Sequence, residues 1–125
     1  MIPINSVWGS FAIEVTGTKL YFGGDTGWAS HFEYLGKAFA PFDVCMLPVG
    51  AYSPRWFMQS SHIDPAQAVS AFNMLKGKTF IPMHYGTYDL SDEPMSEPLR
   101  LLEKEFESKS RSGLKLPAVG EIIPL

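Results

Sequence analysis

The strongest constraint on the fold is an almost continuous apolar run, FDVCMLPV, at residues 42–49. A run of this length and composition is typical of a β-strand that is covered on both faces. A second run, KTFIPMH at residues 78–84, has the same character. Segments with helical spacing of apolar residues lie beside both runs. The sequence therefore predicts central strands of a sheet packed against helices, which is the α/β class.

The beginning of the chain predicts a β-hairpin. Phe11, Ile13 and Val15 alternate with more polar residues, which is the period-two pattern of a half-buried strand. A turn at residues 16–18, centred on a glycine, then leads into a second apolar stretch at residues 19–22. We expect these two strands to pair with each other.

Three helices and a last strand complete the predicted order, β-β-α-β-α-β-α-β. The first helix covers residues 29–39, before Pro41. The second has Asp64 as its N-cap and Pro65 as its first residue, and it runs to about Leu75. The third follows a stripe of apolar residues at Met95, Leu99, Leu102 and Phe106. GEIIPL at residues 120–125 is predicted to be a short closing strand. Trp56, Phe57 and Met58, in the loop before the second helix, are expected to fill a core.

Size and composition set the limits on function. With 125 residues, 46% of them hydrophobic, residues 1–125 are predicted to form a single domain. The net charge of −3 comes from interspersed acids and bases, which argues against nucleic acid as a partner. No targeting segment or spanning helix is evident, so we expect a soluble cytoplasmic chain. The single cysteine, Cys45, lies in an apolar run and is predicted to be a small buried residue.

Two polar residues follow predicted strands directly, where α/β sheets place their sites. Asp25 stands in FGGDTG after the second strand, and His84 ends the run at residues 78–84. Glycines beside both residues permit a close approach of backbone or of a bound ion. A carboxylate together with an imidazole suggests a site for zinc or a similar ion.

Each of these residues also has an ordinary structural explanation. Asp25 is equally suited to form a turn or to cap the first helix. His84 fits a hydrogen-bonded core histidine, and His62, just before the second helix, fits a surface loop. His31 is expected to be solvated. Taken one residue at a time, the sequence leaves these alternatives open.

A set of short motifs in a fixed order narrows the choice. The motifs are W-G-S at 8–10, G-D-T-G at 24–27, P-F-D at 41–43, P-V-G-A-Y-S-P-R-W-F-M at 48–58, H-I-D-P at 62–65 and H-Y-G-T at 84–87. In this order they resemble the C-terminal half of the metallo-β-lactamase superfamily. The likeness extends from residue 7 to residue 105. It is greatest to the N-acylphosphatidylethanolamine phospholipase D-like metal-dependent hydrolases, which are related to the L-ascorbate-6-phosphate lactonases.

The resemblance implies a four-layer αββα sandwich with two zinc ions at its edge. It matches Asp25 to the carboxylate that bridges the two ions and His84 to a histidine that ligates one of them. It matches His62 to a histidine that orients the substrate or protonates the leaving group. The implied activity is zinc-dependent hydrolysis of a small-molecule phosphodiester or lactone, with two metals activating water.

The principal metal motif of that family, H-x-H-x-D-H, has no counterpart in these residues. We therefore expect a partial fold that lacks the N-terminal half of the sandwich and is inactive by itself. Half a sandwich leaves an apolar sheet face open, so we expect either a homo-oligomer or a piece of a longer protein. Two other hypotheses remain. One is a truncated module with a structural or assembly role. The other is an unrelated α/β binding domain, in which Asp25 and His84 lie far apart.

Overall fold

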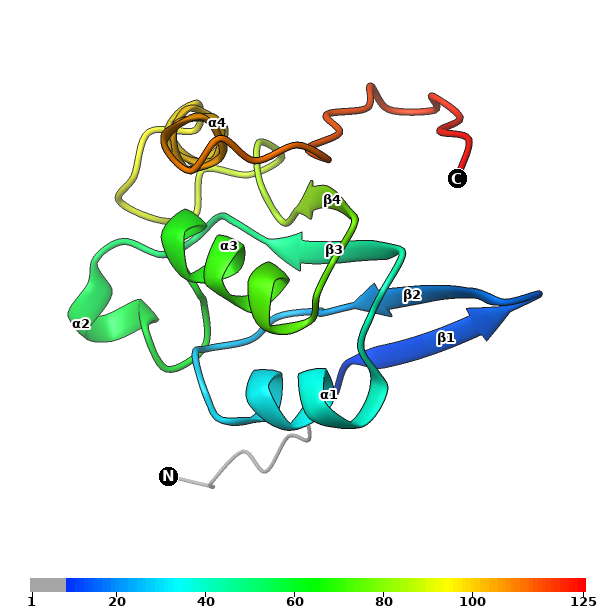
Figure 1. The fold of residues 1–125 in the computed structure, drawn as a ribbon. Helices are drawn as coiled ribbons and strands as arrows, with labels where there is room; N and C mark the ends of the chain where they lie inside the picture. The colour runs from blue at the N-terminus through cyan, green and yellow to red at the C-terminus, as the bar shows by residue number, and fades with distance from the viewer. Residues whose placement is uncertain (1–8) are drawn as a thin grey trace.

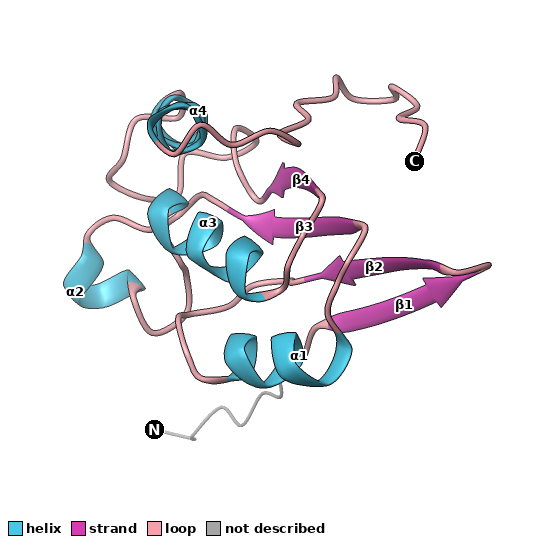
Figure 2. Ribbon diagram, in the orientation of Figure 1, coloured by secondary structure: helices cyan, strands magenta, loops and turns pink. Residues whose placement is uncertain are grey.

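The computed structural model of the chain describes residues 9–125 and contains one four-stranded sheet (Figures 1 and 2). The strands lie side by side in chain order: β1 (Phe11–Val15), β2 (Thr18–Phe22), β3 (Val44–Pro48) and β4 (Thr79–Met83). β1 pairs with β2 antiparallel, whereas β2, β3 and β4 pair in parallel. The carboxyl ends of β2, β3 and β4 therefore share one edge of the sheet.

The hairpin between β1 and β2 follows the sequence prediction. Val15 pairs with Thr18, so the loop contains two residues, Thr16 and Gly17. Both have positive φ angles, 48° and 84°. Two positive φ angles are the signature of the type I′ turn, whose twist matches that of the strands that it joins.

Four helices lie among the described residues; three of them pack against one face of this sheet, and the short second helix lies beyond its carboxyl edge (Figure 1). The four are α1 (His31–Phe39), α2 (Arg55–Met58), α3 (Pro65–Met74) and α4 (Glu97–Ser108). α3 begins as predicted, with Asp64 as N-cap and Pro65 in the first turn. The Asp64 side chain accepts a hydrogen bond from the Gln67 N–H at 2.8 Å, and Gln67 accepts one from the Asp64 N–H at 3.2 Å. This reciprocal capping box fixes where α3 starts.

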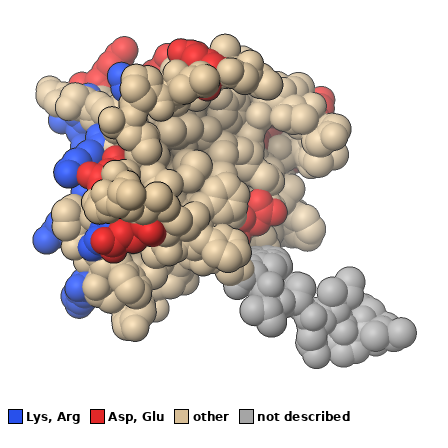
Figure 3. Space-filling view, turned by 90° about the vertical axis from the view of Figure 1, so that its right-hand side faces the viewer, with Lys and Arg blue, Asp and Glu red and all other residues tan. Residues whose placement is uncertain are grey.

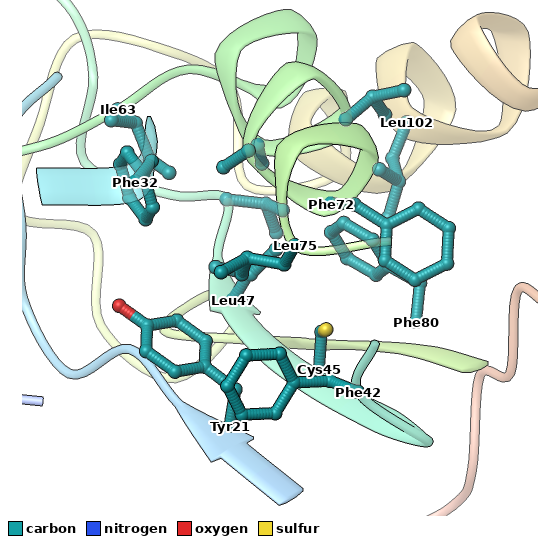
Figure 4. Close-up of a cluster of buried hydrophobic side chains, with 14 of the residues drawn as sticks. Tyr21, Phe32, Phe42, Cys45, Leu47, Ile63, Phe72, Leu75, Phe80 and Leu102 are labelled. Carbon is teal, nitrogen blue, oxygen red and sulfur yellow. The ribbon is translucent and has the colours of Figure 1, made fainter. Parts of the chain in front are cut away.

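The core lies between the helices and the covered face of the sheet, as Figure 4 shows. Tyr21, Cys45 and Phe80 are directly paired neighbours on β2, β3 and β4, and all three are fully buried. Phe72 of α3 packs against Phe80 and Phe106, with ring centroids 5.3 Å and 5.9 Å away. Burial raises the pKa of the Cys45 thiol to about 12, which keeps it protonated and confirms the predicted buried cysteine.

The opposite face of the sheet, called here the uncovered face, carries apolar side chains without helices over them. By the strand register its apolar residues are Phe11, Ile13, Val15, Leu20, Phe22, Val44, Met46, Pro48, Ile81 and Met83. Val44 and Pro48 of the central strand β3 are nevertheless buried, so the exposure is greatest on β1. All five residues of β1 are exposed, so the prediction of a half-buried strand is wrong. The alternation in sequence is real, but no described segment covers its apolar side. In Figure 3, Lys and Arg gather along one side of the view, whereas Asp and Glu are scattered and also occur on the other side.

The predicted α/β class is confirmed, but the element order differs from the prediction at two places. GEIIPL forms no strand, and only an isolated bridge between Leu114 and Phe80 extends the sheet beyond β4 among the described residues. The loop at 50–62 contains the short helix α2, which sequence periodicity did not reveal.

Two further expectations about aromatic residues have different outcomes. Trp56 and Phe57 do not fill a core, because they are 79% and 64% exposed. A four-residue helix at the surface leaves both rings at the edge of the molecule. Trp8, the first residue of the W-G-S motif, lies outside the described residues. Among the helices of residues 9–125, none combines the length and apolar character needed to cross a membrane.

Candidate metal centre

Asp25 lies just beyond the carboxyl end of β2. The Gly23 N–H donates to the Met46 carbonyl at 2.9 Å, which continues the pairing of β2 with β3 for one more residue. Gly24 then adopts a φ of +61°, a conformation that glycine reaches without steric cost. A Cβ atom there would also lie 3.1 Å from the Gly9 carbonyl oxygen. The two glycines thus end the strand and turn the Asp25 side chain out at the edge.

His84 directly follows β4 at the same edge. Its φ angle is +60°, in the left-handed region that residues with a side chain rarely adopt. Gly50, two residues after β3, packs so closely that a Cβ atom on it would collide with the His84 carbonyl oxygen. Strained conformations of this kind persist where the surrounding structure imposes them, and they concentrate at functional sites.

His62 is delivered by the loop between α2 and α3. Its backbone N–H donates to the Met58 carbonyl at 2.9 Å. The next residue, Ile63, donates its N–H to the Thr26 carbonyl, also at 2.9 Å. Since Thr26 follows Asp25 directly, this hydrogen bond joins the loop of His62 to the loop of Asp25.

The three side chains converge at the carboxyl edge of the sheet. Asp25 Oδ1 lies 3.3 Å from His84 Nε2. The His62 and His84 rings stack, with centroids 5.1 Å apart and planes inclined by 21°. Ligand atoms of all three residues lie within 4.8 Å of one another, and these residues form the one group with metal-ligating potential found in residues 9–125. Asp25 and His84 remain accessible, with side chains 57% and 36% exposed.

The electrostatics favour a neutral His62. Burial lowers the pKa of the His62 imidazole, and the neighbouring His84 lowers it further. His62 Nδ1 is buried and has no hydrogen-bond partner in the structure. An unpartnered polar atom in a protein interior is costly, so His62 Nδ1 is suited to hold a ligand or a water molecule.

The donor set suits a zinc-like cation. Carboxylate oxygen and imidazole nitrogen are ligands of zinc, at about 2.0–2.2 Å. Two ligands of a tetrahedral ion with such bonds lie about 3.3 Å apart, which is the separation of Asp25 and His84. Three donors leave positions open at an ion, so the residues present fit a metal without completing its coordination.

The structure thus brings Asp25, His62 and His84 together, which excludes the hypothesis of a binding domain with Asp25 and His84 far apart. Their individual roles stay predictions. His31, expected to be solvated, is half-buried, and its Nε2 lies 3.3 Å from the Thr26 hydroxyl. It borders a hollow of about 440 Å³ that also includes Asp25.

A cavity of about 320 Å³ adjoins the cluster. It begins at His84 and lies between the loop at 50–51 and the segment at 84–98. Glu93 in its wall is buried and accepts hydrogen bonds from the backbone N–H groups of Tyr52 and Ser53, at 3.2 Å and 3.0 Å. Burial opposes ionisation of Glu93, but these and other hydrogen bonds outweigh it and lower its pKa. Sequence reasoning missed Glu93, because nothing in its local pattern indicates burial.

Comparisons with known proteins identify the family of the chain. The profile of the beta-lactamase superfamily domain matches residues 2–85. The chain is 34% identical to N-acyl-phosphatidylethanolamine-hydrolyzing phospholipase D 1 of Caenorhabditis elegans, over 93% of this chain and 34% of that protein. It is 31% identical to a metal-dependent hydrolase of Pelotomaculum thermopropionicum, over 92% of this chain and 45% of that protein.

The fold has solved relatives as well. Igni18, a metallo hydrolase from the archaeon Ignicoccus hospitalis, superposes with a TM-score of 0.64 at 26% identity, over 88% of this chain and 42% of Igni18. The chain therefore spans between a third and a half of the length of these relatives. The profile match covers well over half of the chain, and the structural match confirms the predicted fold. The chain belongs to the metallo-β-lactamase superfamily, a family of metal-dependent hydrolases.

Proposed function

We propose that the chain is the C-terminal portion of a zinc-dependent hydrolase that cleaves a phosphodiester or a lactone-type ester in the cytoplasm. The observation that carries the proposal is the convergence of Asp25, His62 and His84 at one edge of the sheet. The similarity to a phospholipase D and to a metal-dependent hydrolase supports the reaction class. Neither relative fixes the substrate of this chain.

Each residue has a role that its geometry allows. Asp25 has two carboxylate oxygens and a largely exposed side chain, so it is suited to bridge two cations. His84 presents Nε2 beside that carboxylate, at 3.3 Å, as a nitrogen ligand. When bound, divalent ions polarise the ester and lower the pKa of a water molecule.

His62 is the residue for proton transfer. Its lowered pKa leaves the imidazole neutral at physiological pH, so one ring nitrogen carries a lone pair and the other carries a proton. Its ring lies against His84, which places it beside the metal ligands. It is therefore positioned to accept a proton from the attacking water or to return one to the leaving oxygen.

A second candidate function is structural. The uncovered face presents exposed apolar residues, Phe11 and Ile13 among them, that suit contact with another protein surface. The residues described here supply three potential ligands, fewer than a two-metal site needs. A module that has lost catalysis and retains an assembly role fits both facts.

Metal analysis combined with hydrolysis of a chromogenic phosphodiester and a lactone separates the two functions. The test compares this chain with a longer protein that includes the sequence encoded upstream in the same reading frame. We expect less than one tightly bound equivalent of metal in this chain and activity in the longer protein only. A longer protein that carries H-x-H-x-D-H, binds metal and hydrolyses neither substrate would contradict the hydrolase. A stop codon just upstream of Met1 would favour the assembly module.

A further inference from the structure

We infer that Arg55 is a positioning residue that sets the His62 imidazole against His84. The inference rests on the proposed function in that His62 is the residue for proton transfer there. Arg55 begins α2, seven residues before His62, and it lies in the motif at residues 48–58, where the sequence assigned it no role.

The guanidinium of Arg55 makes hydrogen bonds to two ends of the loop that carries His62. Its Nη1 donates to the carbonyl of Tyr52 at 3.1 Å and to the carbonyl of His62 at 2.9 Å. These two carbonyls lie near the beginning and the end of the loop, so a single side chain holds both together. Only the planar fork of arginine offers several fixed donors of this kind.

A second set of contacts anchors Arg55 to the start of α3. Its Nη2 donates to Gln67 Oε1 at 3.0 Å, and its Nε lies 3.8 Å from Asp64 Oδ2. Gln67 and Asp64 form the capping box of α3 and are thereby fixed in turn. Arg55 is two-thirds buried, so these contacts are partly shielded from water.

The His62 backbone is consequently held on both sides. Its N–H donates to Met58 and its carbonyl accepts from Arg55, while the next N–H donates to Thr26. The ring, in contrast, has a buried Nδ1 without a partner and depends on the backbone and on the His84 stack for its orientation. Loss of the Arg55 hydrogen bond therefore frees the ring to move away from His84.

The test follows the contact between the two rings by nuclear magnetic resonance in the metal-free chain. Centroids 5.1 Å apart predict a nuclear Overhauser effect between ring protons of His62 and His84. We expect Arg55→Met to lose this effect, and Arg55→Lys to weaken it, because one ammonium group cannot reach the His62 carbonyl and Gln67 in the same way. Arg100→Met, which removes an exposed arginine of α4, serves as the matched control and keeps the effect.

An effect of wild-type strength in Arg55→Met would overturn the inference. If Arg55→Met does not fold, Arg55→Lys carries the test, and a wild-type effect in that variant would overturn it equally. A change in melting temperature alone does not alter the ring contact, so a purely structural role of Arg55 predicts an intact effect in every folded variant. Because no metal or substrate is present, a failure of the proposed hydrolase would leave this result unchanged.

Discussion

Two neighbouring rows of the sheet, one residue apart in sequence, have opposite environments. Tyr21, Cys45 and Phe80 form a row on the covered face, and all three are fully buried. Phe22 and its partner Phe11 belong to the adjacent row on the uncovered face and are 37% and 62% exposed. Both rows are apolar, so composition does not explain the difference. The helices of this chain complete one side of the sheet and leave the other side without a cover.

The candidate metal centre lies at the edge where the two faces meet. Asp25 and His84 follow strands β2 and β4 directly, and they remain accessible. Like the sheet, the site is supported from one side: the loop of His62, between α2 and α3, is hydrogen-bonded to the loop of Asp25 through Ile63 and Thr26. An ion held by Asp25, His62 and His84 would keep coordination positions open for ligands from outside this group.

The largest effect is expected on the covered face. Phe72→Ala removes a ring that packs against Phe80 and Phe106. The lost burial and the resulting cavity should lower the free energy of unfolding by about 3–5 kcal/mol. Urea denaturation followed by circular dichroism measures this change. A loss below about 1 kcal/mol would show that the covered face is not the close-packed core described here.

An intermediate effect on stability is expected at the carboxyl edge of the sheet, beside the candidate metal centre. Gly50→Ala places a methyl group against the carbonyl of His84. Because backbone cannot yield as a side chain does, we expect a loss of stability of about 1–3 kcal/mol and a shift of the His84 ring signals. Gly86→Ala is a useful comparison, since no atom lies within 4 Å of a Cβ there, although the φ of +71° also strains it. Unchanged His84 signals in Gly50→Ala would refute the close approach.

Substitutions on the uncovered face should change the self-association of the chain more than its free energy of unfolding. In solution this chain is expected to self-associate through that face, and Ile13→Lys should reduce the association while the free energy of unfolding of the monomer changes within about 0.5 kcal/mol. Glu14→Lys, on the same strand and the other face, is the control. Size-exclusion chromatography with light scattering measures the mass. A wild-type chain that is monomeric with a cooperative melt would contradict this expectation.

The smallest effect is expected at the end of the sheet opposite the metal centre. The Lys19 backbone N–H donates to Asp43 at 2.9 Å, and the Lys78 ammonium lies 2.7 Å from it. These contacts lower the pKa of Asp43. A lowered carboxyl pKa gives stability that is present above the ordinary value, near 3.9, and is lost as pH falls through the folded value. Asp43→Asn should weaken the dependence of the free energy of unfolding on pH in the acid range. An unchanged pH dependence would refute the contacts of Asp43 with Lys19 and Lys78.

Part of this architecture could be predicted from sequence because the responsible interactions are local. The Asp64-Pro65 helix start, the Thr16-Gly17 turn and the central strand are each decided by neighbouring residues. The meeting of Asp25 and His84 followed from the rule that parallel strands end at one edge.

The remaining features depend on which segments pack over a surface. The periodicity of a sequence gives no information on this packing. The alternation in β1 predicts a strand correctly but carries no information on whether a second layer is present. The exposure of Trp56 and the burial of Glu93 are likewise set by distant segments. Arg55 was missed for the same reason, since its partners are brought to it by the loop and by the start of α3.

We propose that Asp25, His62 and His84 are the part of a metal centre that this chain supplies. Titration of the metal-free chain with Zn²⁺, followed by nuclear magnetic resonance of the histidine rings and of the Asp25 backbone, tests it most directly. We expect the signals of Asp25 and His84 to shift together in a saturable way, with weak affinity, and we expect Asp25→Asn and His84→Ala each to abolish the response. Signals at this edge of the sheet that do not respond to Zn²⁺, or a response that survives both substitutions, would contradict it.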